Sequence, residues 1–227
     1  MNLTSLSKDA VFWDRFAPFY HKWASRGAYH KAILQEISRM SEPGWHVLDI
    51  GAATGVIAVP MASFGCFVTA LEPSGGMQEL LINRLSSLGI HNVQIVKRTW
   101  EDIQITGAAP DLVIACNSLH LTAGGIMEGM KKVFESGAGQ IVLVTEVNQG
   151  IAVDFKHINS LQKSCEFLYI RNFRVDSSFH FDSMEEVREL EALLGRNLSI
   201  DWEDGRPCQR DMTDIAVVWW KRRDHNS

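Results

Sequence analysis

The sequence predicts an α/β fold in which a doubly wound, mostly parallel β-sheet is covered by helices on both faces. Between residues 46 and 147, apolar runs of strand length alternate with segments that have helical periodicity. Such alternation is typical of βαβ units, which bury a parallel sheet between two layers of helices. The first apolar run leads into a loop of glycine and alanine, 51–55, at the position where sheets of this kind bind ligands.

The N-terminal segment, residues 8–40, is expected to be helical and to end at Glu42, Pro43 and Gly44. Its aromatic residues recur at helical spacing, with Phe12, Phe16, Phe19 and Trp23 on one stripe and Trp13 and Tyr20 on a second stripe beside it. We expect the first stripe to pack in the core and the second to reach a pocket or the core.

The central elements follow in an alternating order. Strands are expected at 46–50, 66–72, 92–98, 111–117 and 139–147, and helices at about 55–63, 77–88 and 126–134. Because crossover connections are nearly always right-handed, these strands should lie in one sheet with helices on both faces.

The last third of the chain is less regular. Residues 151–170 have the pattern of an amphipathic helix, 171–181 an extended segment, and 182–194 a helix with a polar cap and an acidic first turn. Two further strands, 198–204 and 214–222, are close enough in sequence to form an antiparallel C-terminal hairpin.

Composition limits the partners that the chain is expected to have. The 227 residues carry a net charge of −5, and 46% are hydrophobic, which suits a globular protein with a core. The basic residues form no long run, and Lys221–Arg223 is expected to be a solvated tail. The charge therefore disfavours nucleic acid and membrane surfaces as partners.

The cysteines and histidines suggest a reducing compartment and no metal site. Cys66, Cys116, Cys165 and Cys208 are far apart, and the spacings of His21, His30, His157 and His180 match no metal motif. The start of the sequence lacks the pattern of a signal peptide, and no apolar run is long enough to span a bilayer. We therefore expect a cytoplasmic protein with free thiols.

The glycine loop and the acid that ends the next strand indicate a nucleoside-containing ligand. Small residues at 51–55 let the backbone approach a ligand, and the amides of this loop favour a negative group. Glu72, about 20 residues further on, is placed to accept hydrogen bonds from ribose hydroxyls. The alternative is that the glycines only permit tight packing and that Glu72 is a surface acid.

The order of residues in the loop resembles the first motif of the class I S-adenosylmethionine-dependent methyltransferases more than that of a dinucleotide-binding protein. Asp49, Gly51 and Gly55 match the family's first motif, (D/E)xGxGxG, with Ala53 in place of its second glycine, whereas GxGxxG is not present. The segments "ALEPSGGM", "VKRTWEDI" and "DLVIACNSLHL" resemble the family's next three strands and their loops. The resemblance implies a Rossmann-like sheet of seven strands.

The same resemblance implies a set of cofactor-binding residues for S-adenosylmethionine. They are Asp49, Gly51, Ala52, Ala53, Gly55, Glu72, Pro73, Met77, Thr99, Trp100, Glu101 and Asn117. Glu72 would bind the ribose, Pro73 and Met77 would lie near the adenine, Trp100 would stack on or shield the ring, and Glu101 would accept from its amino group.

Tyr20 and His120 are the candidate catalytic residues. "FWDRFAPFYHKW" resembles a helical lid that many small-molecule members carry ahead of the glycine loop, which implies that Tyr20 reaches the cofactor carboxylate or the methyl group. Asn117, Ser118 and His120 follow the fourth strand and should face the acceptor, where His120 is the best candidate base or else a structural hydrogen-bonding residue. The absence of a (D/N)PP(F/Y) motif there argues against exocyclic amine acceptors.

The predicted function is methyl transfer from S-adenosylmethionine to the oxygen, sulfur or carbon of a small molecule, in a monomer or homodimer. The alternatives are a non-catalytic binding or regulatory protein, an RNA methyltransferase and an NAD-dependent oxidoreductase. We expect one methyltransferase domain, with a lid at 1–42, a cofactor-binding core at 43–150 and a specificity segment at 151–227. In that last segment, Arg171 and Arg174 could meet an anionic acceptor or lie on a solvated strand.

Overall fold

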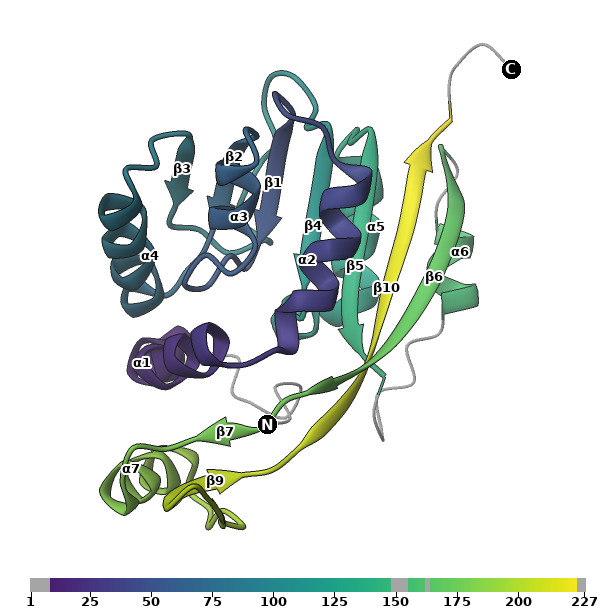
Figure 1. Cartoon of the computed structure of the whole chain (residues 1–227). Coiled ribbons are helices and arrows are strands. Elements are labelled where there is room, and N and C mark those ends of the chain that lie inside the picture. The colour runs from purple at the N-terminus through teal and green to yellow at the C-terminus, as the bar shows by residue number, and fades with distance from the viewer. Residues whose placement is uncertain (1–8, 148–154, 162–163, 224–227) are drawn as a thin grey trace.

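A seven-stranded sheet with the order β3-β2-β1-β4-β5-β10-β6 forms the centre of the molecule (Figure 1). The computed structural model describes residues 9–147, 155–161 and 164–223. Strands β1 to β5 are parallel, and β10 runs antiparallel to both of its neighbours, β5 and β6. The predicted α/β class and the seven-stranded, mostly parallel sheet are confirmed.

The strands of this sheet are β1 (His46–Ile50), β2 (Phe67–Leu71), β3 (Val93–Val96), β4 (Leu112–Cys116), β5 (Gln140–Glu146), β6 (Cys165–Asp176) and β10 (Met212–Arg222). A separate three-stranded sheet contains β7 (Phe179–His180), β8 (Asp201–Glu203) and β9 (Arg206–Gln209). The helices are α1 (Ala10–Arg26), α2 (Tyr29–Met40), α3 (Ala58–Ser63), α4 (Gly75–Leu88), α5 (Gly125–Glu135), α6 (Phe155–Leu161) and α7 (Met184–Leu194), with a 3-10 turn, η2 (Leu119–Leu121).

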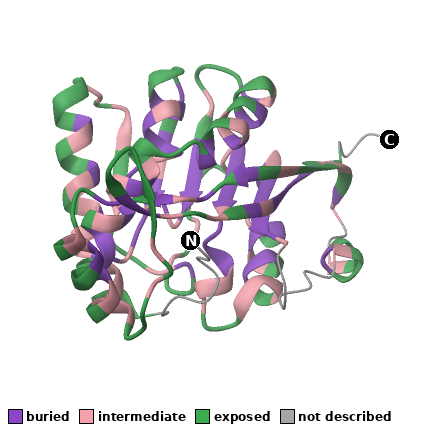
Figure 2. Ribbon diagram, turned by 60° about the horizontal axis from the view of Figure 1, so that its bottom comes forward, coloured by how far each residue is buried: buried purple, intermediate pink, exposed green. Residues whose placement is uncertain are grey.

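Two apolar layers hold the helices against the sheet. Alternate residues of β1 point to opposite faces, so Val47 packs with α2, α3 and α4 while Leu48 packs with α5 and α6. The buried residues follow the central strands, and exposed residues gather on the outer turns of the helices (Figure 2). Because both faces are covered, the parallel strands are apolar throughout rather than alternating.

The N-terminal helical segment consists of two helices instead of one. Helix α1 begins after the N-cap Asp9, whose side chain accepts a hydrogen bond from the amide of Val11, and it ends before Gly27. A Cβ atom at Gly27 would lie 2.9 Å from the Trp23 carbonyl oxygen, so this position suits glycine. The chain turns here, and α2 then lies against the sheet.

The helix predicted over 151–170 is wrong beyond Leu161. Helix α6 occupies Phe155–Leu161, and Cys165 already begins strand β6, while 151–154 lie outside the described residues. Residues 165–170 continue the helical spacing, but Phe167, Tyr169 and Ile170 also favour strands. Pairing with β10 along eleven residue pairs, and packing against its tryptophans, decides in favour of the strand.

The predicted pairing of 198–204 with 214–222 is also wrong. Residues 201–203 form β8, which pairs with β9 through a two-residue turn at Asp204–Gly205, where φ is +49° and +75°. Positive φ at both positions is the geometry of a tight hairpin turn, and Asp-Gly favours it. Strand β10 instead pairs with β5 and β6, so the C-terminal antiparallel pair is β6–β10, two strands joined by the small lobe.

Strands β6 and β10 continue past the sheet and lead into a small lobe made of β7, β8, β9 and α7 (Figure 1). Helix α7 begins after Ser183, whose hydroxyl caps the amide of Glu186, and ends at Gly195 in the left-handed conformation. Lys221 and Arg222, expected in a tail, are the last residues of β10, and Arg222 Nε donates to the Ala138 carbonyl at 3.1 Å. Among the residues that the structure describes, no helix is long and apolar enough to cross a bilayer.

Candidate active site

A cavity of about 520 Å³ lies at the carboxyl ends of β1, β2 and β4, where α1 also contributes to its wall. Its lining includes Ala10, Trp13, Tyr20, His30, Ile50, Gly51, Ala53, Leu71, Glu72, Pro73, Met77, Arg98, Thr99, Trp100, Glu101, Cys116, Asn117, Ser118, Leu121, Thr122 and Ala123. The volume is in the range of sites that bind small molecules and cofactors. Its location is the one expected for an open α/β sheet, beyond the carboxyl ends of the strands.

The amides of the glycine loop are used within the chain. Gly51 and Ala52 donate to the Leu71 carbonyl at 2.8 and 3.0 Å, and Gly55 donates to the Ala52 carbonyl at 2.9 Å. Ala53, at a φ of +48°, donates its N–H to Glu72 at 2.8 Å. These four amides therefore do not form the anion-binding loop that the sequence suggested.

Packing accounts for two of the glycines. A Cβ atom at Gly51 would lie 2.5 Å from Ser118 Cβ, and one at Gly55 would lie 2.4 Å from Leu81 Cδ1. Gly51 also lines the cavity, whereas Gly55 and Ala52 do not. The packing interpretation of the loop therefore holds for Gly55, and the loop contacts the cavity through Gly51 and Ala53.

Glu72 is a buried carboxylate in the cavity wall, and not a surface acid. It follows β2 and accepts the amide N–H of Ala53 and that of Ser74, each at 2.8 Å. Burial raises the pKa of this carboxyl to about 7, although the two backbone hydrogen bonds act to lower it. The carboxylate is thus fixed in position by the protein, and it retains oxygen lone pairs for a ligand.

Asp49 lies beneath the cavity rather than in its lining. It is buried near the carboxyl end of β1, and burial raises the pKa of its carboxyl to about 7 while a backbone hydrogen bond from Ala58 lowers it. Within the described chain, its Oδ2 atom has no hydrogen-bond partner. The carboxyl of Asp49 thus interacts with the backbone at the start of α3 and does not line the cavity.

We define the cofactor end of the cavity as the part lined by Glu72, Pro73, Met77 and the loop after β3, Arg98–Glu101. Trp100 is buried and its Nε1 donates to the Gly129 carbonyl at 3.1 Å. The Lys132 ammonium donates to the carbonyls of Trp100, of Glu101 at 2.9 Å and of Ile103 at 2.7 Å. The loop is therefore held rigidly by α5.

Glu101 and Thr99 are already engaged in this loop. A carboxylate oxygen of Glu101 accepts the amide N–H of Ala123, and the Thr99 hydroxyl donates to Asp102 at 2.8 Å. Both residues still line the cavity, but the Glu101 oxygen that accepts from Ala123 is shared with the chain. Any contact of Glu101 with an adenine amino group would have to use the remaining lone pairs.

The segment after β4 shapes the opposite part of the cavity. Asn117, with a φ of +49°, donates from Nδ2 to the Tyr29 hydroxyl at 2.7 Å, and that hydroxyl donates to Glu146 at 3.3 Å. Among the described residues, Asn117 Oδ1 and Ser118 Oγ are buried without a hydrogen-bond partner. The chain therefore presents polar atoms here that it does not itself satisfy.

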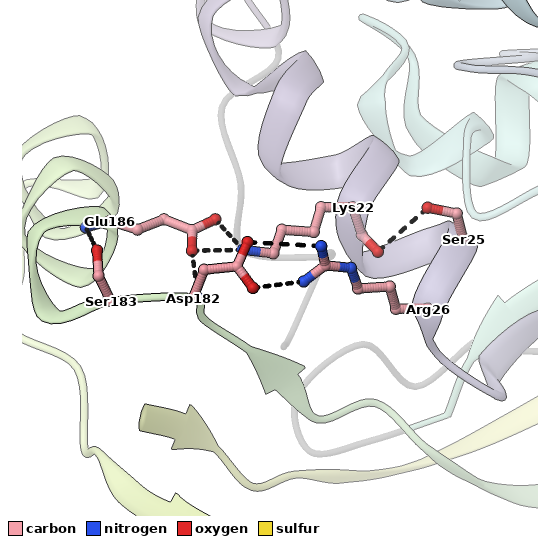
Figure 3. Close-up of polar contacts among 6 residues, drawn as sticks. All are labelled: Lys22, Ser25, Arg26, Asp182, Ser183 and Glu186. Atoms are coloured by element: carbon pink, nitrogen blue, oxygen red, sulfur yellow. Dashed lines mark hydrogen bonds and ion pairs between the residues drawn. The ribbon is translucent and has the colours of Figure 1, made fainter. Parts of the chain in front are cut away.

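Helix α1 is held at both of its ends above the cavity. Asp14 accepts from the Ser74 hydroxyl at 2.6 Å and from the Gly76 amide at 2.9 Å, at the start of α4. At the other end, Lys22 and Arg26 pair with Asp182 at 2.8 and 2.9 Å, and Lys22 also contacts Glu186 of α7 (Figure 3). The helix is thus clamped between the sheet domain and the small lobe.

Trp13 and Tyr20 of α1 both line the cavity. Burial raises the pKa of Tyr20 well above its ordinary value, so its hydroxyl is neutral. His120 lies in the turn η2, outside the lining, while its neighbour Leu121 is part of the wall. The structure therefore brings Tyr20, but not His120, into the cavity.

Residues 165–176 do not contribute to the cavity in the way expected. Arg171 pairs with Glu36 at 3.2 Å and stacks on Tyr169, and Arg174 is exposed on β6. Neither arginine belongs to the lining. His30, Arg98 and Leu121–Ala123 also line the cavity, and none of them was predicted as a site residue. Arg98 and Leu121 lie in segments that resemble the family but carry no role there, and His30 reaches the cavity only through tertiary packing.

Within the described residues, no group of three or more histidine, cysteine, aspartate or glutamate side chains is arranged to hold a metal ion. The thiol of Cys116 lines the cavity, and burial raises its pKa far above the ordinary value. The site therefore presents the buried Glu72 carboxylate, the charged residues Arg98 and Glu101, aromatic rings and neutral polar groups.

Comparisons with known proteins show what this fold is similar to. Residues 47–137 match the family model described as a methyltransferase domain. A TehB-like SAM-dependent methyltransferase from Corynebacterium glutamicum is similar in structure, with a TM-score of 0.59 and 13% identity, over 95% of this chain and all of that chain. The chain therefore has the Rossmann-like fold of class I methyltransferases. Residues 47–137 resemble a methyltransferase domain, and the predicted resemblance to S-adenosylmethionine-dependent members is confirmed.

Two curated relatives match shorter regions. An uncharacterized protein of Haemophilus influenzae is 33% identical over 91 residues, which are 40% of this chain and 33% of the relative. The protein-L-isoaspartate O-methyltransferase 1 of Rhodopseudomonas palustris is 30% identical over 115 residues, 50% of this chain and 46% of the relative. The chain thus spans less than half the length of each of these relatives.

Proposed function

We propose that the chain is an S-adenosylmethionine-dependent methyltransferase that methylates the oxygen, sulfur or carbon of a small molecule. The observation that carries this proposal is the buried Glu72 carboxylate in the wall of a cavity beside the glycine loop. A carboxylate at the end of the second strand is suited to accept hydrogen bonds from both hydroxyls of a ribose.

The residues of the cavity fit S-adenosylmethionine. Glu72 would bind the ribose, Pro73, Met77 and Trp100 would enclose the adenine, and Gly51 and Ala53 would border the methionine part. Asn117 Oδ1 and Ser118 Oγ are suited to accept and donate hydrogen bonds there. When bound, S-adenosylmethionine supplies a methyl group that is activated by a positively charged sulfur.

The hydrogen bonds of the loop favour this ligand over a dinucleotide. A pyrophosphate needs free amides at the glycine loop. Four amides of residues 51–55 donate within the chain instead, and Asp14 already accepts from Gly76 at the start of α4. Helix α3 is only 6 residues long and offers little dipole.

The chain would accelerate methyl transfer mainly by positioning. Trp13 and Tyr20 cover the cavity from α1, which excludes water and fixes the orientation of the reactants. A general base is required only where the acceptor arrives protonated. The mostly apolar wall and the size of the cavity favour a small acceptor over RNA, since the chain carries a net charge of −5.

Four free cysteines support a reducing, cytoplasmic location. The position of α1 above the cavity supports the lid at 1–42. We retain the division into this lid, a core at 43–150 and a specificity segment at 151–227 as part of the proposal. We also retain the monomer or homodimer as the expected state of assembly.

Calorimetric titration with S-adenosylmethionine, S-adenosylhomocysteine and NADH tests the proposal. We expect both sulfur ligands to bind and Glu72→Ala to weaken them by about 100-fold or more, because a ligand with two ribose hydroxyls would lose a charged acceptor. Glu79→Ala, at an exposed position of α4, is the matched control and should bind normally.

The outcomes separate the alternatives. Binding of NADH without the sulfur ligands would contradict the proposal and support an oxidoreductase. Binding of S-adenosylmethionine without transfer of its labelled methyl group to any molecule in a panel of alcohols, phenols, thiols and carbon acids would support a non-catalytic binding protein.

A further inference from the structure

The inner end of the cavity, which we define as Tyr20, His30, Cys116, Asn117 and Ser118, contains polar groups that the protein leaves unsatisfied. His30 is only 6% exposed, and its Nδ1 atom has no hydrogen-bond partner among the described residues. Asn117 Oδ1 and Ser118 Oγ share this property. Buried polar atoms without partners are rare and destabilising, so their grouping at one end of a cavity indicates a ligand.

These five residues form one continuous site. The Trp23 ring lies 5.6 Å from Tyr20 and 5.5 Å from His30, and the Tyr29 ring lies 4.9 Å from His30. The Tyr29 hydroxyl in turn accepts from Asn117 Nδ2. Helices α1 and α2 and the segment after β4 therefore converge on the same volume, and aromatic rings fix the imidazole from two sides.

The inner end carries no formal charge at neutral pH. Burial, with a smaller contribution from the positive charge of Arg84, lowers the pKa of His30 to about 4. Burial raises the pKa values of Tyr20 and Cys116, so both keep their protons. The charged residues of the lining, Glu72, Arg98 and Glu101, lie on the segments that follow β2 and β3. The carboxyl groups of Glu72 and Asp49 add to the rise in the pKa of Tyr20, and those of Asp49 and Glu146 add to the rise in the pKa of Cys116.

We propose that His30 is a catalytic residue that binds a small, uncharged acceptor bearing an O–H or S–H group and takes its proton during methyl transfer. This inference rests on the proposed function and specifies its acceptor. A charged acceptor would have to be desolvated against neutral side chains, which is costly without a partner. A neutral hydroxyl or thiol instead finds a hydrogen-bond acceptor in the imidazole and further partners in Asn117 and Ser118.

The step balances in atoms and charge. The acceptor oxygen or sulfur forms the new bond to the methyl carbon, and the carbon–sulfur bond of the sulfonium breaks with its electron pair left on that sulfur. The proton of the acceptor passes to His30, so the positive charge moves from the sulfonium to the imidazolium. Because methylation makes the O–H or S–H strongly acidic, a weakly basic imidazole is sufficient to receive the proton.

The other candidates in the site are less suited to this role. Tyr20 and Cys116 already carry protons at neutral pH, so neither is ready to receive one. His120 does not line the cavity. His30 is the only histidine among the described residues that line the cavity. Its side chain is uncharged, and its Nδ1 atom has no hydrogen-bond partner in the described chain.

Nuclear magnetic resonance of the protein labelled with ¹⁵N-histidine tests the inference. The protein is saturated with S-adenosylhomocysteine and titrated with phenol and 2-mercaptoethanol as uncharged probes, and with benzoate and benzylammonium as charged ones. We expect only the uncharged probes to bind and to shift the ring nitrogens of His30, whose signals are assigned by their loss in His30→Asn.

Turnover measurements complete the test. Transfer of a labelled methyl group to the same uncharged probes should fall by about 100-fold or more in His30→Asn. His30→Gln, whose side-chain oxygen can accept a hydrogen bond but not a proton, should retain probe binding but not turnover. His21→Asn is the matched control, since His21 of α1 also has a buried Nδ1 atom without a partner but does not line the cavity.

Each outcome has one meaning. Failure of S-adenosylhomocysteine to bind the wild-type protein would contradict the proposed function itself. If it binds, three results overturn the inference. Charged probes could bind with the same affinity as phenol, uncharged probes could bind without shifting the ring-nitrogen signals of His30, or no uncharged probe could bind at all. Wild-type turnover in a folded His30→Asn protein would also overturn it.

Discussion

The cofactor end and the inner end of the cavity differ in how the protein treats its own polar groups. At the cofactor end, Glu72 receives two amide hydrogen bonds and Lys132 fixes three carbonyls of the loop after β3. At the inner end, His30, Asn117 and Ser118 each carry a buried polar atom without a partner in the described chain. The first region is organised before any ligand arrives, whereas the second is completed by one.

This difference suggests how the two ligands are recognised. A preorganised region does not lose entropy of its own on binding and can hold the larger ligand in a single orientation. A region with unsatisfied groups discriminates strongly, because a ligand that fails to pair them leaves the cost of burial in place. The following predictions test the comparison, from the largest expected effect to the smallest.

Lys132→Ala should disrupt the cofactor end most strongly. It removes three charge-assisted hydrogen bonds and the cation–π contact with Trp100, 4.9 Å from the ring centroid. We expect a loss of about 3 kcal/mol in the free energy of unfolding and an affinity for S-adenosylhomocysteine that falls more than about tenfold. Denaturant titration and calorimetry measure the two effects. Lys131→Ala, at the exposed neighbouring position, should change neither, and equal effects of both substitutions would show that the loop does not depend on Lys132.

The affinity for S-adenosylhomocysteine should rise with pH through the pKa of Glu72. Ribose hydroxyls donate to the carboxylate form, and burial raises the pKa of this group to about 7. Protonation therefore competes with the ligand below pH 7, and the affinity should fall about tenfold between pH 8 and pH 6. Calorimetry at several pH values measures the slope. A Glu72→Gln protein should bind weakly with no such slope, and a slope that persists in it would assign the titration to another group.

A pair of serine substitutions gives the smallest effect and the sharpest contrast. Ser74 caps α4 through the amide of Met77 at 3.2 Å and donates to Asp14 at 2.6 Å, so Ser74→Ala should lower stability by about 1 to 2 kcal/mol. Ser118→Ala removes a hydroxyl that has no partner within the described chain, and its effect should be close to zero. Urea unfolding of the two proteins compares them directly, and a large loss from Ser118→Ala would mean that the inner end is satisfied internally.

The parallel strands β1 to β5 could be predicted from the sequence because each is a short, mostly apolar run next to a helix or a turn. The errors lie where local signals compete. Residues 165–170 fit helical spacing, and only their pairing with β10 makes them a strand. The Asp204–Gly205 dipeptide is a strong hairpin signal for pairing 201–203 with 206–209, and it competes with the apolar run at 214–222 for the role of partner strand.

The site was predictable where a motif precedes it along the chain. Glu72, Pro73 and Met77 follow the second strand, and Asn117 follows the fourth, so their position in the cavity comes from the order of the elements. His30 reaches the cavity because α2 turns back from α1 after Gly27, which no local pattern indicates. Likewise, the amides of the glycine loop donate hydrogen bonds to Leu71, the last residue of β2, and to Glu72, which follows it. No local pattern in the loop indicates these bonds.

Strand β10 has a consequence for how this chain can be shortened. It covers β5 along seven residue pairs and is itself buried from Ile215 to Trp220, yet it comes from the far end of the sequence. A fragment that stops after β5 would retain most of the cavity and all of the residues that match the methyltransferase domain, 47–137. It would also expose an apolar strand with an unpaired edge, which promotes aggregation. The unit defined by sequence similarity is therefore smaller than the unit that can fold.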